Sequence, residues 1–199
     1  MNHISLPSID QPFEWVAGVG ELTLAGAGFS LTAPPETDWF INPDTETVIQ
    51  SAPALVTPAP PGDFVLGARV RARTAARFDA GVLLAYSDDR TWAKLCLERS
   101  PDNELMVVSV VTRGTSDDAN GEVVDGDATW LRIARVGRAM AFHSSVDGVR
   151  WRFVRQFRLA GGGIQVGFLA QSPAGQGSSA DFAGAFLEGK RLSNLRDGQ

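Results

Sequence analysis

Cysteine and histidine are scarce in this sequence of 199 residues, which holds one cysteine, Cys96, and two histidines. A single cysteine cannot form a disulfide within its own chain, so the disulfide-stapled folds typical of small secreted proteins are excluded. The same scarcity argues against a zinc site built from cysteine and histidine.

Long apolar runs and an excess of positive charge are also missing. No run approaches the roughly 18 apolar residues that a membrane-spanning helix needs. Residues 1–15 have neither a basic start nor the apolar stretch of a secretory leader, so a cytoplasmic location is expected. The net charge is −5 and the basic residues are scattered, which argues against a nucleic-acid partner.

What the sequence does contain is the alternation of apolar and polar residues typical of β-strands. No window of about 11 residues carries a helical apolar stripe free of glycine and proline. The expected strands cover residues 13–16, 21–24, 28–33, 64–73, 78–86, 92–99, 105–113, 129–136, 139–145, 150–159, 164–170 and 180–187. Their close spacing predicts an all-β sandwich of two antiparallel sheets, in a single domain 1–199 with a polar tail from about residue 189.

Two stretches interrupt this pattern and are expected to be irregular. Residues 34–62 are rich in proline and are expected to hold a few short extended pieces, and residues 114–127 are polar and acidic. Long loops in compact domains often carry function, and calcium prefers oxygen ligands from acidic loops. Because the acids in 114–127 lack the fixed spacing of an EF-hand, a solvated acidic loop is favoured over a calcium site.

Residues 78–99 are expected to form a hairpin that turns at residues 87–90. Its register pairs Ala80 with Leu97, Val82 with Leu95 and Leu84 with Ala93 on the core face. The opposite face then pairs Asp79 with Glu98, Leu83 with Lys94 and Ala85 with Trp92. Burial of the apolar face fixes this register, since a slip of one residue would invert every side chain.

The polar face of this hairpin has two interpretations. In the first it is a ligand cleft, in which the indole of Trp92 stacks on a sugar ring and carboxylates accept hydrogen bonds from hydroxyl groups. In the second it is a solvated surface on which Lys94 pairs with a carboxylate. The candidate ligand-binding residues are Trp39, Asp79, Trp92, Lys94, Glu98 and Asp117, with Asp79 and Glu98 as the candidate catalytic acids.

Later hairpins are expected to turn at residues 137–138 and 147–148. They place Leu131, Ile133, Met140, Phe142, Trp151 and Phe153 on a core face, and Arg132, His143 and Arg152 in a row on the other face. Such a row could hold an anionic group, but an exposed face paired with acids is favoured. A catalytic role for Cys96 with His143 as its base is disfavoured, since nothing in the sequence brings them together.

Several stretches resemble, in order, a family of bacterial and fungal proteins of uncharacterised function. They are APPETDWF (33–40), FDAGVL (78–83), WAKLCLE (92–98), SVVT (109–112), SD (116–117), RIARVG (132–137) and SVDGVRW (145–151). That family belongs to the concanavalin A-like lectin/glucanase superfamily and includes the yeast regulator of enolase. The resemblance spans roughly residues 13–187 and implies a jelly-roll sandwich of twelve to fourteen strands with one concave sheet. Family members often carry an aromatic residue where this chain has Asp118.

Together these features predict a module that binds a carbohydrate or a sugar-containing metabolite. One alternative is a glycoside hydrolase or lyase that uses Asp79 and Glu98. Another is a regulator of a metabolic enzyme that acts through a protein partner or as a homodimer. No cofactor and no membrane partner are expected.

Overall fold

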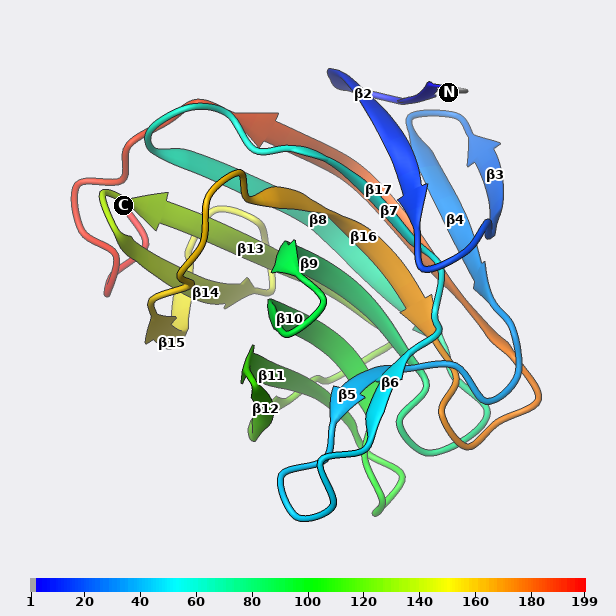
Figure 1. Cartoon of the computed structure of the whole chain (residues 1–199). Coiled ribbons are helices and arrows are strands. Elements are labelled where there is room, and N and C mark those ends of the chain that lie inside the picture. Colours follow the sequence, from blue (N-terminus) through cyan, green and yellow to red (C-terminus); the bar gives the residue numbers. More distant parts are fainter. Residues whose placement is uncertain (1–2) are drawn as a thin grey trace.

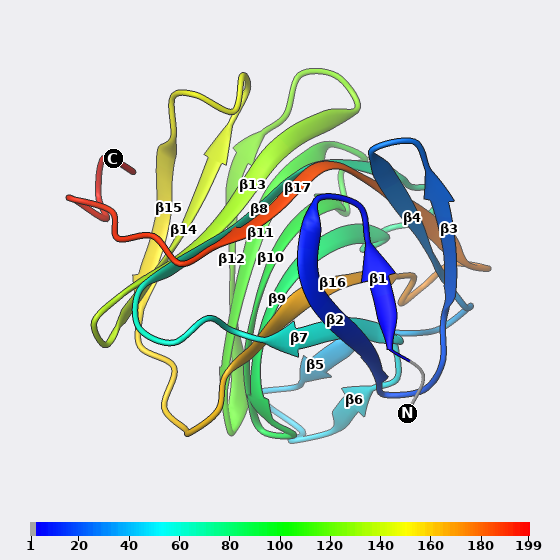
Figure 2. The same ribbon diagram turned by 90° about the horizontal axis from the view of Figure 1, so that it is seen from above.

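The computed structural model describes residues 3–199, which contain seventeen strands and no helix. Met1 and Asn2 lie outside the described residues. They belong to residues 1–15, the segment in which no secretory leader is expected. All strand pairings are antiparallel, and two large sheets pack face to face (Figures 1 and 2). The expected all-β sandwich is confirmed. No helix in residues 3–199 is long and apolar enough to cross a membrane.

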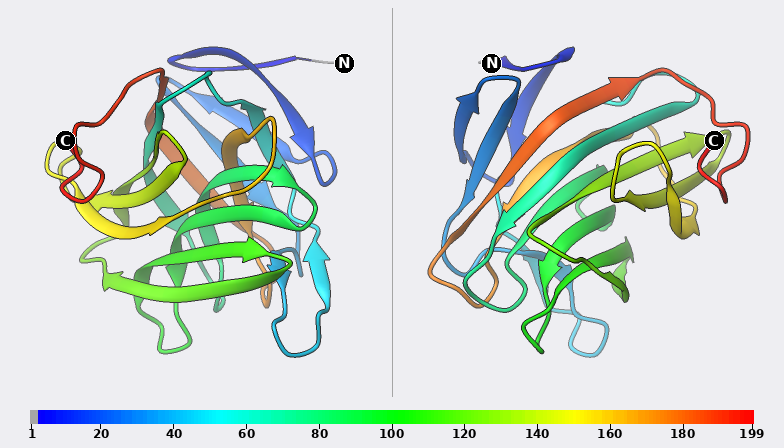
Figure 3. Two further views of the ribbon diagram at one scale, coloured as in Figure 1. Left: turned by 60° about the vertical axis from the view of Figure 1, so that its left-hand side comes forward. Right: turned by 180° about the vertical axis from the view of Figure 1, so that it is seen from behind.

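Each sheet mixes strands from distant parts of the sequence. The eight-stranded sheet has the order β1 (Ile4–Leu6), β2 (Ile9–Val16), β7 (Ala54–Pro58), β16 (Gln165–Gln171), β9 (Ala80–Asp88), β10 (Thr91–Arg99), β11 (Leu105–Arg113) and β12 (Thr115–Val123). The seven-stranded sheet has the order β15 (Arg152–Phe157), β14 (Ala139–Ser145), β13 (Ala128–Val136), β8 (Phe64–Arg73), β17 (Ser178–Glu188), β4 (Gly28–Ala33) and β3 (Glu21–Ala25). The right-hand view of Figure 3 shows β17, β8 and β13 lying side by side in this sheet. A separate ribbon pairs β5 (Trp39–Ile41) with β6 (Val48–Gln50).

The main core lies between the two large sheets. Phe168 of β16 and Phe182 of β17 are both fully buried, and their ring centroids lie 5.1 Å apart. Phe29 of β4 lies at the same distance from each of these rings. Burial of such large apolar side chains between facing sheets is the main force that holds a β-sandwich together.

A second apolar cluster lies on the outer face of the eight-stranded sheet, the face turned away from the main core. Here the β5–β6 ribbon covers the sheet, and Trp39 and Ile41 pack against Val82, Leu84 and other buried side chains of the strands. Both faces of β9 are therefore buried, one against the main core and the other beneath this ribbon.

In the hairpin of β9 and β10, the register is shifted by one residue from the expected one. Asp88 pairs with Thr91 but Tyr86 pairs with Trp92, so Ser87 forms a β-bulge. An extra residue on one strand turns all the following side chains to the other face. In place of the expected pairs, Leu83 lies opposite Leu95, Ala85 opposite Ala93, Val82 opposite Cys96 and Leu84 opposite Lys94. Val82 and Leu84 are buried as expected, but on the outer face.

The two stretches expected to be irregular contribute strands. Residues 115–123, within the expected acidic loop, form β12 at the edge of the eight-stranded sheet. The proline-rich stretch contains β5, β6 and β7, and β7 lies between β2 and β16 inside the same sheet.

A second bulge changes the faces expected for the hairpin of β14 and β15. Phe142 pairs with Arg155 but His143 pairs with Phe153, so one residue of β15 is skipped. Ile133 and Phe142 lie in the main core as expected, whereas Phe153 is only half-buried and lies beside His143. The expected row of three basic residues is also wrong, because Arg152 pairs with Ser144 and only Arg132 lies opposite His143.

The C-terminal segment, residues 189–199, packs against the outer face of the seven-stranded sheet near β14 and β15 (Figure 3). The guanidinium of Arg132 donates to the carbonyl oxygen of Gly198 at 2.8 Å, and Nε2 of His143 lies 2.6 Å from the carbonyl oxygen of Leu195. Leu192 is buried in a small cluster with Val65. The segment is mostly polar, as expected, but it is docked onto the sandwich.

Candidate ligand-binding pocket

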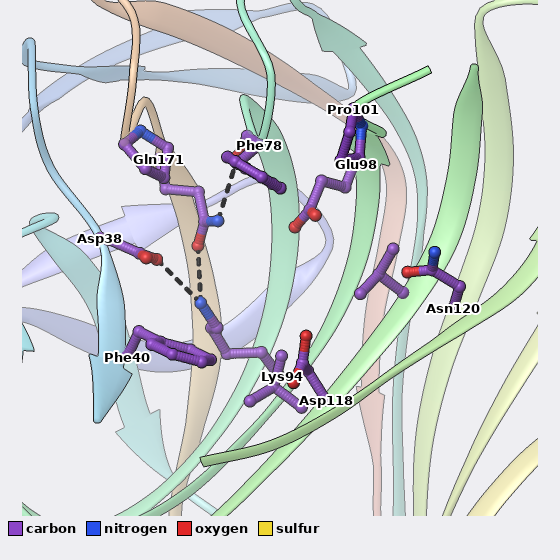
Figure 4. Close-up of a pocket in the computed structure, with 12 residues that line it drawn as sticks. Asp38, Phe40, Phe78, Lys94, Glu98, Pro101, Asp118, Asn120 and Gln171 are labelled. Atoms are coloured by element: carbon purple, nitrogen blue, oxygen red, sulfur yellow. Dashed lines mark hydrogen bonds and ion pairs between the residues drawn. The ribbon is translucent and has the colours of Figure 1, made fainter. Parts of the chain in front are cut away.

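A pocket of about 380 Å³ opens on the outer face of the eight-stranded sheet, beside the β5–β6 ribbon (Figure 4). Its lining comprises Asp38, Phe40, Phe78, Lys94, Glu98, Pro101, Val108, Val110, Asp118, Asn120, Gln171 and Pro173. This volume lies in the range of about 300–1,000 Å³ that small-molecule sites occupy. The pocket combines apolar walls with a few polar groups that face one another, which is the usual composition of such sites.

Alternation along the strands brings the polar groups together. Every second residue of a strand faces the same side of its sheet, so Lys94 and Glu98 of β10 both face outward. Lys94 lies opposite Val110 of β11, which in turn lies opposite Asp118 of β12. Gln171 ends β16, which lies beyond β9 on the other side. The neighbouring strands β10, β11 and β12, together with the end of β16, therefore supply the floor, and the β5 segment supplies one wall.

Lys94 is held between two acceptors. Its Nζ donates to Asp38 Oδ1 at 3.0 Å and to Gln171 Oε1 at 2.8 Å, and only 2% of its side chain is exposed. Burial alone lowers the pKa of Lys94, but the nearby charges, above all that of Asp38, outweigh it and raise the pKa above its usual value. Lys94 is therefore a fixed ammonium at neutral pH.

The carboxyl group of Glu98 has the opposite character. Burial raises its pKa to about 8; the charge of Lys94 counteracts this shift, and those of Asp38 and Asp118 add to it. Within residues 3–199 no group donates a hydrogen bond to this carboxyl, although only 9% of the residue is exposed. At neutral pH Glu98 is therefore mostly protonated and faces the pocket as a neutral acid.

Two phenylalanine rings contribute to the walls. Phe40 is the middle residue of the ribbon strand β5 and is half-buried, and Phe78 precedes β9 and is 39% exposed. The backbone of Phe78 has φ = +67°, which costs a non-glycine residue about 1–3 kcal/mol. It is held by hydrogen bonds from its N–H to the Arg99 carbonyl at 2.8 Å and from Gln171 Nε2 to its own carbonyl at 3.2 Å. Such a conformation persists only where the surrounding contacts hold it, so these hydrogen bonds fix the place of the Phe78 ring.

Of the six residues expected to bind a ligand, Lys94 and Glu98 line the pocket. Asp79 does not, because it precedes β9 and its buried carboxylate holds two loops together. Its Oδ2 accepts from the N–H groups of Ala75 and Ala76 at 2.9 Å each, and its Oδ1 accepts from Ser172 Oγ at 2.8 Å. The expected pairing of Asp79 with Glu98 is wrong, since Ala80 lies opposite Glu98.

The two tryptophans and Asp117 also lie outside the pocket lining. Trp39 and Trp92 are fully buried, with ring centroids 5.4 Å apart in an edge-to-face arrangement, so neither presents a ring face to a ligand. Asp117 points to the other side of β12, where its Oδ2 lies 2.9 Å from Arg155. Its neighbour Asp118 lines the pocket instead.

Several residues of the pocket lining were not predicted from the sequence. Some of them are direct neighbours of residues that were. Asp38 and Phe40 flank Trp39 within residues 33–40, and Phe78 precedes Asp79. The sequence does not show that these neighbours face the pocket, because the face on which each side chain lies depends on the register of the strands. Gln171 carries no sequence signal, because its role depends on the end of β16 lying beside β9.

The acids considered for calcium do not gather in one place. Asp117, Glu122 and Asp127 pair with Arg155, Arg152 and Arg71, respectively. Within residues 3–199, no three His, Cys, Asp or Glu side chains are grouped so that they could hold a metal ion. These three acidic residues are therefore charge partners on the protein surface.

Cys96 lies under the pocket in the cluster with Trp39 and Trp92. Burial raises the pKa of its thiol far above the usual value, so a thiolate nucleophile does not form there. His143, its candidate base, belongs to β14 in the other sheet.

Comparison with known proteins identifies a family and a fold. A family model described as "Protein of unknown function (DUF1349)" matches residues 15–189. No curated protein matches the sequence. A functionally unknown protein from Saccharomyces cerevisiae superposes with a TM-score of 0.79 at 21% identity, covering 90% of this chain and 97% of the yeast chain. That match does not connect the chain with enolase.

Two further similar structures come from sugar-related proteins. The GH43 protein BlXynB from Bacillus licheniformis superposes with a TM-score of 0.67 at 14% identity, and the match covers 83% of this chain but 34% of BlXynB. The exoplasmic/lumenal domain of VIP36, solved with Ca²⁺ and Man3GlcNAc bound, gives a TM-score of 0.54 at 9% identity, with 92% and 85% coverage. At these identities the likeness establishes the fold, a β-sandwich of the lectin/glucanase type.

Proposed function

This chain belongs to the DUF1349 family of proteins of unknown function, and from the geometry of its pocket we propose that it binds a carbohydrate or a sugar-containing metabolite. The observation that carries the proposal is the meeting of two aromatic rings, Phe40 and Phe78, with a set of polar groups in one cavity. A sugar has an apolar ring face and a rim of hydroxyl groups, so it needs both kinds of partner in one place.

The polar groups suit a ligand rich in hydroxyl groups. Glu98 and Asp118 can accept hydrogen bonds from hydroxyl groups, while the amide of Asn120 can both donate and accept. Two of the three protons of the Lys94 ammonium are used by Asp38 and Gln171, so one remains for a ligand oxygen. The fixed position of Lys94 lowers the entropy cost of ligand binding.

The comparisons add support by analogy of fold. VIP36 was solved with a bound oligosaccharide, and BlXynB is a member of a glycoside hydrolase family. Since this chain matches about a third of BlXynB, the activity of that enzyme does not transfer to it.

Titration calorimetry with a panel of mono- and oligosaccharides tests the proposal. We expect at least one sugar to bind, and Phe78→Ala to weaken its binding about tenfold or more through loss of ring contact. Phe153→Ala is the matched control, because Phe153 is a half-buried phenylalanine on the other sheet. Absence of binding across the panel, or equal affinity of the wild type and Phe78→Ala, would contradict the proposal.

A second candidate function, glycoside hydrolysis or a related lyase reaction, rests on the protonation of Glu98. A carboxyl group with a pKa of about 8 carries a proton at neutral pH and can donate it to a leaving oxygen, as the acid of a glycosidase does. Asp79, the expected second acid, lies outside the pocket, so Asp118 is the candidate partner carboxylate. Chromogenic glycosides test this function: turnover by the wild type that Glu98→Gln abolishes would support it, and no turnover would exclude it for those substrates.

A further inference from the structure

The pocket contains more acidic groups than basic ones. Its lining has three carboxyl groups, those of Asp38, Glu98 and Asp118, and one cation, Lys94. Lys94 is already paired with Asp38, so Glu98 and Asp118 have no basic partner on the pocket surface. These two acids face the pocket from β10 and β12.

Of these two acids, Glu98 is the more deeply buried. About nine-tenths of it is buried, its carboxyl points into the pocket (Figure 4), and no group in residues 3–199 donates a hydrogen bond to it. Its carboxyl oxygens open to the pocket, so water can reach them, but a carboxyl this deeply set is solvated less well than one on the protein surface. A ligand that donates hydrogen bonds or carries positive charge would supply a partner.

We propose that the pocket selects ligands that carry a protonated amine, such as an amino sugar, and that the ammonium binds between Glu98 and Asp118. This inference rests on the proposed sugar-binding function and narrows it to one chemical class. An ammonium group can donate to both carboxyl groups, as Lys94 does to Asp38 on the other side of the pocket.

The aromatic walls favour the same class of ligand. Phe40 and Phe78 both line the pocket, and the face of an aromatic ring attracts a cation placed within about 6 Å of it. A neutral sugar gains ring contact but no charge attraction, and an anionic sugar is repelled by the Asp118 carboxylate. The polar and aromatic groups therefore rank the three kinds of ligand in the order amine, neutral, anionic.

Binding of an amine should release a proton from Glu98. Its carboxyl is influenced by Lys94 from its own strand, by Asp38 from the segment before β5 and by Asp118 from β12. An ammonium ion placed against it stabilises the carboxylate, so the carboxyl proton passes to solvent while the ligand keeps its own. No covalent bond is made or broken in this step.

Calorimetric titrations with glucosamine, glucose and glucuronic acid test the inference, run at about pH 6, where an aliphatic amine is protonated. We expect glucosamine to bind at least about tenfold more tightly than glucose, and its heat to depend on the ionisation enthalpy of the buffer, with about one proton released per ligand. Glu98→Gln should remove both the preference and the proton release. Asp117→Asn, an acid-to-amide change on β12 that points away from the pocket, is the matched control and should retain both.

The outcomes separate this inference from the function on which it rests. Equal affinity for glucose and glucosamine, or a preference for glucuronic acid, overturns the amine selectivity and leaves sugar binding in place. Failure of any sugar to bind overturns both. A preference for glucosamine that persists in Glu98→Gln, with native circular dichroism, also overturns the inference, because the selective group would then lie elsewhere.

Discussion

The ammonium of Lys94 lies 3.0 Å from Oδ1 of Asp38, although 56 positions separate them in the sequence. The contact joins β10, a central strand of the eight-stranded sheet, to the segment that leads into the β5–β6 ribbon. Only 2% of the Lys94 side chain and 15% of that of Asp38 are exposed, so little water is present to replace either partner. The pair therefore fixes the wall of the pocket to its floor.

Replacing Asp38 by Asn should destabilise the fold by about 3–5 kcal/mol, because it leaves the buried Lys94 without a counter-charge. The amide oxygen can still accept from the N–H of Trp39, which Asp38 Oδ1 does at 2.7 Å, so the substitution mainly removes charge. Urea denaturation measures the effect. The double variant Asp38→Asn/Lys94→Met should recover most of the loss, and a cost below about 1 kcal/mol for Asp38→Asn would show that the pair is unimportant.

Glu98 should make the protein less stable as the pH rises. Its pKa is about 8 in the folded state against 4.5 for the free group, so folding favours its protonated form. This contribution is complete below pH 4.5 and is lost as the pH rises through 8, at up to about 1.4 kcal/mol per pH unit. Free energies of unfolding measured across this range should fall with pH in the wild type relative to Glu98→Gln. A difference independent of pH would mean that Glu98 is ionised in the folded state.

His143 should act in the opposite direction. Burial lowers its pKa to about 4, the carbonyl of Leu195 counteracts the shift and the charge of Arg132 adds to it. Since the free group has a pKa of 6.5, its contribution to stability is present above pH 6.5 and is lost as the pH falls to about 4. Between pH 4.5 and 6.5 the effects of Glu98 and His143 should partly cancel in the wild type. In Glu98→Gln stability should then rise with pH, and in His143→Asn it should fall; parallel curves for the two variants would contradict both assignments.

Phe142→Ala should cost about 3–5 kcal/mol, because its fully buried ring packs against Phe157 with centroids 4.6 Å apart and its removal leaves a cavity. Phe153→Ala is the comparison on the next strand, where the ring is half-buried and lies under Arg196. It should cost less than half as much in the same denaturation measurement. Equal costs would mean that the faces of β14 and β15 are wrongly assigned.

Alternation of apolar and polar residues predicted most strands because most have one face in the main core. The expected ranges of β4, β8, β11 and β14 agree with the structure residue for residue. Alternation did not give the register of β9, whose residues 80–85 are all apolar or glycine. Both faces of that stretch are buried, so the pattern does not indicate which face meets the main core. The bulge at Ser87, which sets the register, could therefore not be predicted from it.

The alternation of residue types along β10 also predicted part of the candidate site. Lys94 stands out in β10 as a charged residue between buried apolar ones, and Glu98 follows the buried Leu97; both side chains face the pocket. Trp92 lies on the same face, but the β5–β6 ribbon covers it, a contact between segments distant in the sequence that no local pattern reveals. The positive φ of Phe78 and the position of Gln171 also depend on the assembled sheets.

The acidity of β12 has a consequence for how copies of this chain meet. As the last strand of the eight-stranded sheet, β12 leaves one row of backbone hydrogen-bonding groups free to pair with another strand. Asp118 is exposed along it, and Asp117 is exposed as well although it pairs with Arg155, so two such edges brought together in an antiparallel arrangement would place like charges close to one another. The acidic residues that favoured a loop assignment in the sequence thus disfavour pairing between the β12 edges of two copies of this chain.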